Sequence, residues 1–201
     1  HWGLPCANYR ITNMQAAIGI QQMNRAWDMI NKRTENAEYL RSLLEDVPGI
    51  VLPAEQSFGD RVYFYFLIRL LPEVLGTDML NFGIALAAEG TYNINYLSTT
   101  RWMIAQHLEP MFVNKNGYGG TKCPFECPLY EGEVSYHEGM CPNAEKAAEE
   151  VFWLASPHPL LEKKDLDDIA AAVRKVAFAF VEKKEKGIPI DYATDELRAR
   201  L

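Results

Sequence analysis

The stretch "PCANYRITNMQAAIGIQQM", from Pro5 to Met23, places polar residues directly ahead of a helix start. Thr12 and Gln15 have the spacing of a capping box, in which the threonine hydroxyl accepts from the N–H three residues on and the glutamine reaches back. This pair predicts a helix that begins just after Thr12. The cap needs neither Asn8 nor Arg10, so these two residues require another explanation.

The predicted helix is unusually long. No proline interrupts the chain between Asn13 and Pro48, apolar residues recur at roughly helical spacing, and Gly49 supplies a stop. A helix that runs to about Asp46 would be roughly 50 Å long. A compact body of this chain length is roughly 40 to 45 Å across. We therefore expect the helix to overhang its own domain and to rest on another molecule.

Composition narrows the class of protein. The chain has 201 residues, of which 48% are apolar, enough for one substantial core. The net charge of −7 and the scattered lysines and arginines exclude a nucleic-acid or anionic-membrane surface. No apolar run of about 18 residues and no signal-peptide pattern is present. We expect small-molecule or protein partners and a cytoplasmic location.

Three cysteines and a histidine are close together in the sequence. Cys123, Cys127, His137 and Cys141 follow C-x3-C-x9-H-x3-C, which could in principle close a tetrahedral zinc site. The spacing is not that of a tight zinc knuckle, and Cys141 precedes a proline that suits a helix start. An ordinary loop with free thiols is favoured, so no metal is predicted.

Regular elements follow the first helix. The run "VYFYFLIRL" at 62–70 is β-branched and aromatic with little alternation, which predicts a strand covered on both faces. Thr77 or Asp78 can cap a helix that reaches Glu89. Residues 91–97 alternate well enough for a second strand.

The second half of the chain begins with a segment that has no clear helix or strand pattern. Residues 98–140 show no clear element, and long loops of this kind are generally functional or mobile. Pro142 begins a helix that we expect to continue through Val151, and 163–187 has the charge pattern and apolar stripe of a final helix. The chain is thus divided into a linker with a long interface helix (1–48), an α+β small domain (49–187) and a peripheral tail (188–201).

Six motifs occur in a fixed order from residue 8 to about 178: "NYRITNMQAAIGIQQM", "VYFYFLIRL", "LAAEGTYNINY", "QHLEPMF", "CPNAEKAAEEVFWLASPHPLL" and "DLDDIAAAVRKV". This order resembles the C-terminal half of the DegT/StrS-type sugar aminotransferases, pyridoxal-phosphate enzymes with the α/β fold of fold type I. The first motif is the most specific. The fifth resembles most the branch with scyllo-inosamine aminotransferases and 3-amino-5-hydroxybenzoate synthases.

The resemblance implies roles for single residues. Asn8 would donate to the cofactor phosphate of the other subunit in a homodimer, and Arg10 would support that site by charge or hold the interface. On the residues alone, the simpler interpretation is that Asn8 forms a turn and that Arg10 is a solvated surface charge. A helix N-terminus beside them nevertheless suits a phosphate. His107 matches a histidine of the substrate-side loop, or it is structural. Asn95 and Tyr96 would form part of the wall over the substrate together with His107, although they stand where many members have His-Tyr.

The resemblance also implies what this chain does not carry. The Schiff-base lysine, the carboxylate on the pyridine nitrogen and the stacked aromatic ring all precede the first motif in the family. None of the ten lysines has the expected context. We therefore predict no catalytic residue here: the chain is the dimerising helix plus the small domain of a larger aminotransferase, inactive by itself.

The complete protein is expected to move an amino group from glutamine or glutamate to a keto-sugar or a cyclic ketone, with pyridoxal 5'-phosphate as cofactor. Three alternatives stay open. In the first, the chain is a non-catalytic dimerisation or regulatory domain. In the second it is a zinc-binding interaction module, and in the third it is a sugar-binding domain that uses the loop at 98–140.

Overall fold

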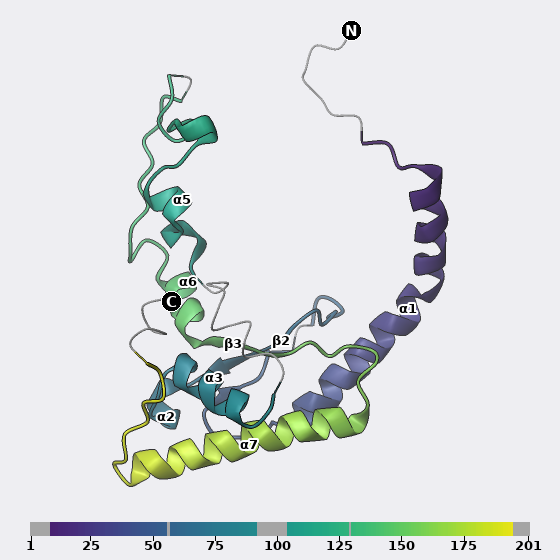
Figure 1. Ribbon diagram of the computed structural model, residues 1–201, viewed down its shortest axis with the longest axis vertical. Coiled ribbons are helices and arrows are strands. Elements are labelled where there is room, and N and C mark those ends of the chain that lie inside the picture. Colours follow the sequence, from purple (N-terminus) through teal and green to yellow (C-terminus); the bar gives the residue numbers. More distant parts are fainter. Residues whose placement is uncertain (1–8, 56, 92–103, 129, 195–201) are drawn as a thin grey trace.

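The structure is a computed structural model that describes residues 9–55, 57–91, 104–128 and 130–194. Its centre is a three-stranded antiparallel sheet in the order β1-β2-β3 (Figure 1). The strands are β1 (Ile50–Val51), β2 (Phe66–Leu70) and β3 (Val151–Ala155). Within the sheet, Ile50 pairs with Leu70 and Arg69 pairs with Val151, so β2 is the middle strand.

Strand β2 is shorter than the predicted 62–70 and differs from it in burial. Phe66, Ile68 and Leu70 are buried, whereas Leu67 and Arg69 are exposed. This is the alternation of a strand with one covered face. The prediction of two covered faces is therefore wrong, because the core is built on only one side of β2.

The core joins the sheet to helices α3 (Met79–Ala88) and α7 (Lys163–Glu185). Phe82 of α3 meets Phe152 of β3 and Phe180 of α7 edge-on, at centroid distances of 5.7 and 6.1 Å. Such aromatic contacts add to the stabilisation that burial alone provides. The final helix is thus confirmed, and its stripe residues Leu166 and Val173 are fully buried.

Helix α3 is confirmed with Asp78 as its cap. The Asp78 Oδ1 atom accepts from the Asn81 N–H at 2.8 Å, and Glu89 caps the C-terminal end of the helix before Gly90, which has φ +83°. Thr77 is not the cap. A four-residue helix that was not predicted, α2 (Pro72–Leu75), fills the turn between β2 and α3.

Helix α6 (Pro142–Glu150) ends one residue before Val151, through which the helix was expected to continue. Val151 begins β3, which pairs with β2 and buries Phe152 and Leu154. The prediction of a helix through Val151 is therefore wrong: pairing with β2 outweighs the helical pattern that precedes it. The predicted strand at 91–97 lies outside the described residues, apart from Thr91.

Helix α1 (Asn13–Ser42) begins as predicted. The Thr12 N–H donates to Gln15 Oε1 at 2.9 Å and the Gln15 N–H donates to Thr12 Oγ1 at 3.3 Å, which confirms the capping box. The helix ends earlier than the expected Asp46. Its buried residues are Asn36, Ala37 and Leu40, all near its C-terminal end. Figure 1 shows the rest of the helix projecting from the body, as the overhang predicts.

Residues 104–128 and 130–141 form a second projection, here called the excursion (Figure 1). It carries three short helices: η1 (Gln106–Leu108), α5 (Pro110–Val113) and η2 (Tyr118–Gly120). Phe112, Phe125 and Tyr136 pack together with centroid distances of 5.3 to 6.1 Å. The excursion therefore has a small core of its own.

The described part of the predicted tail packs on α3. The Asn81 Oδ1 atom accepts from the N–H groups of Tyr192 and Ala193 at 2.7 and 3.1 Å, and Ile190 is buried. Among the described residues, no helix is both long enough and apolar enough to cross a bilayer.

Candidate functional site

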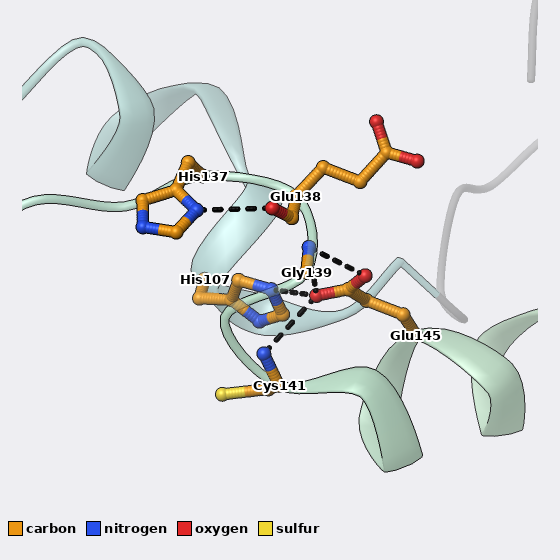
Figure 2. Close-up of polar contacts among 6 residues, drawn as sticks. All are labelled: His107, His137, Glu138, Gly139, Cys141 and Glu145. Atoms are coloured by element: carbon orange, nitrogen blue, oxygen red, sulfur yellow. Dashed lines mark hydrogen bonds and ion pairs between the residues drawn. The ribbon is translucent and has the colours of Figure 1, made fainter.

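A cluster of polar contacts around Glu145 lies at the base of the excursion, where residues 107 and 139–141 come together (Figure 2). His107 comes from η1 and Glu145 from the first turn of α6. The His107 Nε2 atom lies 2.8 Å from Glu145 Oε1, and the two side chains are only 9% and 17% exposed. A short, largely dry contact of this kind fixes both side chains.

Glu145 also accepts hydrogen bonds from the backbone. Its oxygens accept from the Gly139 N–H at 2.9 and 3.0 Å and from the Cys141 N–H at 3.1 Å. These bonds, with the amide of Gly139 first, lower the pKa of Glu145 below its ordinary value. One ionised carboxylate thus ties the chain that enters the excursion at His107 to the chain that leaves it at 139–141.

The four candidate zinc ligands are not gathered. The His137 Nδ1 atom lies 2.9 Å from the backbone oxygen of Glu138 (Figure 2), and the neighbouring Cys127 side chain, followed by burial, raises the pKa of the Cys123 thiol. Cys141 lies at the base, where its N–H bonds Glu145. In the described part of the chain, no three His, Cys, Asp or Glu side chains are grouped to hold a metal ion.

Arg10 is exposed, two residues before the Thr12 cap. The first turn of α1 contains no acidic residue, so its partial positive charge is not neutralised within the helix. Asn8, Asn95 and Tyr96 lie outside the described residues. The predicted phosphate and substrate groups are therefore represented in the structure only by Arg10 and His107.

The surroundings of the lysines bear on the prediction that the Schiff-base lysine lies outside this chain. All ten are described, and each one lies against a partner on the surface. Lys183, for example, donates to the Tyr192 hydroxyl at 2.6 Å, and Lys175 pairs with Glu89 at 2.7 Å. The others pair with Glu35, Glu126, Glu150, Asp168, Glu182 or the Glu73 carbonyl, or lie over the Tyr39 ring. A Schiff-base lysine is instead desolvated or set beside another cation.

The projecting part of α1 presents apolar side chains to solvent. Met14, Ile18, Met23 and Trp27 are 58 to 77% exposed. Further along, a hollow of about 850 Å³ separates α1 from the segment at 57–63, with Trp27 at one edge. Large apolar side chains grouped on one helix commonly mark a contact with another protein surface.

Comparison with known proteins decides the family. Residues 3–126, more than half of the chain, match the DegT/DnrJ/EryC1/StrS aminotransferase family. The chain belongs to this family. Among curated relatives, the spore coat polysaccharide biosynthesis protein SpsC of Bacillus subtilis is 24% identical over 82% of this chain and 36% of its own length. The dTDP-4-dehydro-2,3,6-trideoxy-D-glucose 4-aminotransferase of Saccharopolyspora spinosa is 34% identical over 36% of this chain and 20% of its own length.

Two solved structures share the fold of this family member. S. venezuelae DesV is 22% identical, with a TM-score of 0.60 over 84% of this chain and 37% of that one. The aminotransferase TlmJ of Streptoalloteichus hindustanus is 23% identical, with a TM-score of 0.53 over 82% and 36%. The chain thus has part of the fold of pyridoxal-phosphate enzymes of fold type I. It spans about a third of the length of SpsC.

Sequence reasoning missed Glu145, the residue with the most bonds in the site. Its only local signal is an acidic residue in the first turn of a helix. Nothing in the sequence joins it to His107, because the two are 38 positions apart.

Proposed function

We propose that this chain is the C-terminal portion of a pyridoxal-phosphate-dependent aminotransferase that moves an amino group from glutamine or glutamate to a keto-sugar or a cyclic ketone. The observation that carries the proposal is the family match over residues 3–126, which includes the motif around Arg10. When bound, pyridoxal phosphate supplies the aldehyde that accepts and passes on the amino group.

The amino end of α1 suits the phosphate of that cofactor. The capping box engages the N–H groups of Thr12 and Gln15, while those of Asn13 and Met14 have no partner one helical turn earlier. Arg10 adds a guanidinium and the first turn adds no acid. We assign the phosphate contact to Asn8, with Arg10 in support.

The same proposal makes the protein a homodimer. Among the described residues, α1 buries side chains only near its C-terminal end, and its projecting part exposes apolar side chains as large as Trp27. A second copy that packs on this part would bury them and would bring Asn8 and Arg10 to the partner's cofactor. A cytoplasmic location completes the proposal, since free thiols persist there.

The substrate wall is assigned to Asn95, Tyr96 and His107. His107 uses Nε2 for Glu145, so a substrate contact would use Nδ1. Because the same bond fixes the base of the excursion, His107 would place the wall as well as touch the substrate. The lysine that carries the cofactor is assigned to another part of the protein, so this chain alone should not transaminate.

The test uses the complete polypeptide that contains this chain. We expect it to bind pyridoxal phosphate and to aminate a keto-sugar or a cyclic ketone with glutamine or glutamate as donor. Asn8→Ala should weaken cofactor binding by about tenfold, the loss of one charge-assisted hydrogen bond. Asn143→Ala, an exposed asparagine of α6 outside the proposed dimer contact, is the matched control. A complete polypeptide that dimerises without binding pyridoxal phosphate would instead be a non-catalytic dimerisation domain.

A further inference from the structure

Six residues of α1 lie close to one line along the helix and are here called the α1 stripe. Their spacings alternate between four and three positions, and the members are Ala16, Ile20, Met23, Trp27, Ile30 and Thr34. At about 100° of rotation per residue, all six lie within about 40° of that line. Alternating spacings of three and four residues are typical of the seam along which two helices of a coiled coil meet. The stripe therefore has the form of a contact with another helix.

The outer members of the α1 stripe are open to solvent. Ile20, Met23 and Trp27 are 60, 69 and 71% exposed, on the part of α1 that projects from the body (Figure 1). Ile30 and Thr34 line the hollow of about 850 Å³ beside α1. The stripe therefore begins in the hollow and continues outward along an exposed surface.

The residues that anchor α1 to its own body lie on other faces of the helix. Asn36, Ala37 and Leu40 are the buried residues of α1. They lie between about 80° and 180° around the helix from Trp27. The part of the body that the structure describes therefore leaves the outer stripe to another occupant.

The order of the stripe residues is matched to a reversed copy of itself. The spacings of four, three, four, three and four are the same in both directions. In an antiparallel pair with a two-fold axis between Met23 and Trp27, each stripe residue faces a stripe residue of the second copy. Trp27 then faces Met23, an aromatic ring beside a thioether, which is a favourable contact. Ile20 faces Ile30 in the same arrangement.

The charges of α1 also favour the antiparallel direction. Residues 12–24 carry no charge, whereas residues 25–41 carry seven: Arg25, Asp28, Lys32, Arg33, Glu35, Glu38 and Arg41. In a parallel pair each charge would lie at the level of its own copy, and like charges placed together are unfavourable. In the antiparallel pair the charges of 28–38 lie opposite the uncharged stretch instead.

We propose that a second copy of this chain binds along the α1 stripe, antiparallel to the first, with the two-fold axis between Met23 and Trp27. This inference rests on the homodimer of the proposed function and gives that dimer its contact, direction and register. Ala16 of each copy then faces Thr34 of the other, at the hollow. Trp27 lies next to the axis, where large aromatic side chains contribute most to binding.

Disulfide cross-linking of the 201-residue chain tests the register. In the proposed pair Ala16 faces Thr34 of the second copy, whereas two copies of either residue are about 27 Å apart along the helix axis. A disulfide joins residues whose Cα atoms are at most about 7 Å apart. A mixture of Ala16→Cys and Thr34→Cys chains, oxidised with copper phenanthroline, should therefore form a 16–34 link at least about tenfold faster than either variant alone forms 16–16 or 34–34.

Peptide mapping identifies each link and separates it from any link to a native cysteine. Digestion at lysine and arginine places positions 16 and 34 in different peptides, because Arg25 and Arg33 lie between them. Ile18→Cys is the matched control, since Ile18 is 58% exposed but lies about 160° around the helix from Ala16. Mixed with Thr34→Cys, it should give no link.

Circular dichroism of each variant reports whether it is folded. A folded chain that forms 16–16 or 34–34 links, or that links Ile18→Cys as readily as Ala16→Cys, overturns the proposal. A folded chain that is monomeric in sedimentation velocity also overturns it, and the stripe is then left to the rest of the complete polypeptide.

The cross-linking needs no cofactor, so its outcome is separate from that of the aminotransferase proposal. If the complete polypeptide binds pyridoxal phosphate and the 16–34 link does not form, only the antiparallel contact is lost. A 16–34 link in a polypeptide that does not bind pyridoxal phosphate supports the contact and removes the aminotransferase proposal.

Discussion

His107 and Glu145 meet at 2.8 Å although 38 positions of the chain separate them. The contact turns a long irregular segment into a closed loop with a defined base. Because the same carboxylate accepts from Gly139 and Cys141, a single side chain holds both ends of the excursion.

The first prediction concerns that carboxylate. Glu145→Gln should open the base, since a neutral amide accepts more weakly and presents one oxygen in place of two. Amide hydrogen exchange at Gly139 and Cys141 should accelerate by about tenfold, as expected when local opening becomes easier. Glu149→Gln, on the exposed side of the same helix, is the control. Unchanged exchange in Glu145→Gln would mean that the base does not depend on this side chain.

The second prediction is a pH dependence. The native pKa of Glu145 lies below its ordinary 4.5, so its contribution to stability is fully present above that pH. As the pH falls through the lower native pKa, the carboxylate is protonated and the contribution is lost. The difference in exchange between the native chain and Glu145→Gln, corrected for intrinsic rates, should therefore be constant near neutral pH and shrink in acid.

The third prediction concerns a buried amide. Asn36 is 3% exposed, and its Nδ2 atom donates to the His158 carbonyl at 2.8 Å. Asn36→Ala leaves that carbonyl without this donor and should lower the free energy of unfolding by about 1 to 3 kcal/mol. Urea denaturation measures the change. Asn31→Ala, on the exposed side of α1, should have little effect; equal losses in both variants would contradict the assignment.

The fourth prediction concerns the projecting part of α1. Trp27→Glu should weaken self-association of the chain by at least about tenfold, because a charge replaces a large apolar anchor. Sedimentation velocity at several concentrations measures it. Thermal stability of the monomer should not change, since Trp27 is 71% exposed. Tyr118→Glu, at an 80% exposed position on the excursion, is the control. A chain that is monomeric without substitution would rule out this contact.

The fifth prediction concerns the lysines. Treatment of the chain with pyridoxal phosphate and borohydride should label several surface lysines to low and similar extents. Each lysine is paired at the surface, so none is preferred as an amine. Peptide mapping gives the labelled positions. One lysine modified completely at equimolar reagent would show that a Schiff-base site lies in this chain after all.

Features that depend on neighbours in sequence could be predicted. Residues only a few positions apart determine three such features: the capping box of Thr12 and Gln15, the Asp78 cap and the buried stripe of α7. In these cases the local hydrogen bond or the helical period determines the structure, and no distant partner is needed.

Features that depend on residues distant in sequence could not be predicted. Val151 follows a helical pattern, yet it pairs with Arg69 of β2 and begins a strand. Leu67 lies in an apolar run, yet β2 alternates between buried and exposed residues, so Leu67 lies on its exposed face. The Glu145 contacts arise for the same reason, because folding brings together residues that no sequence period relates.

The bond from Asn36 to His158 has a mechanical consequence. Helix α1 is anchored near Asn36 and reaches Asn13 about 35 Å away, at 1.5 Å per residue. A tilt of about 5° at the anchor displaces the first turn by about 3 Å, roughly the length of a hydrogen bond. The contacts at the inner third of the helix, which include the Asn36 amide and the buried Ala37 and Leu40, therefore limit how precisely a group at its far end can be positioned.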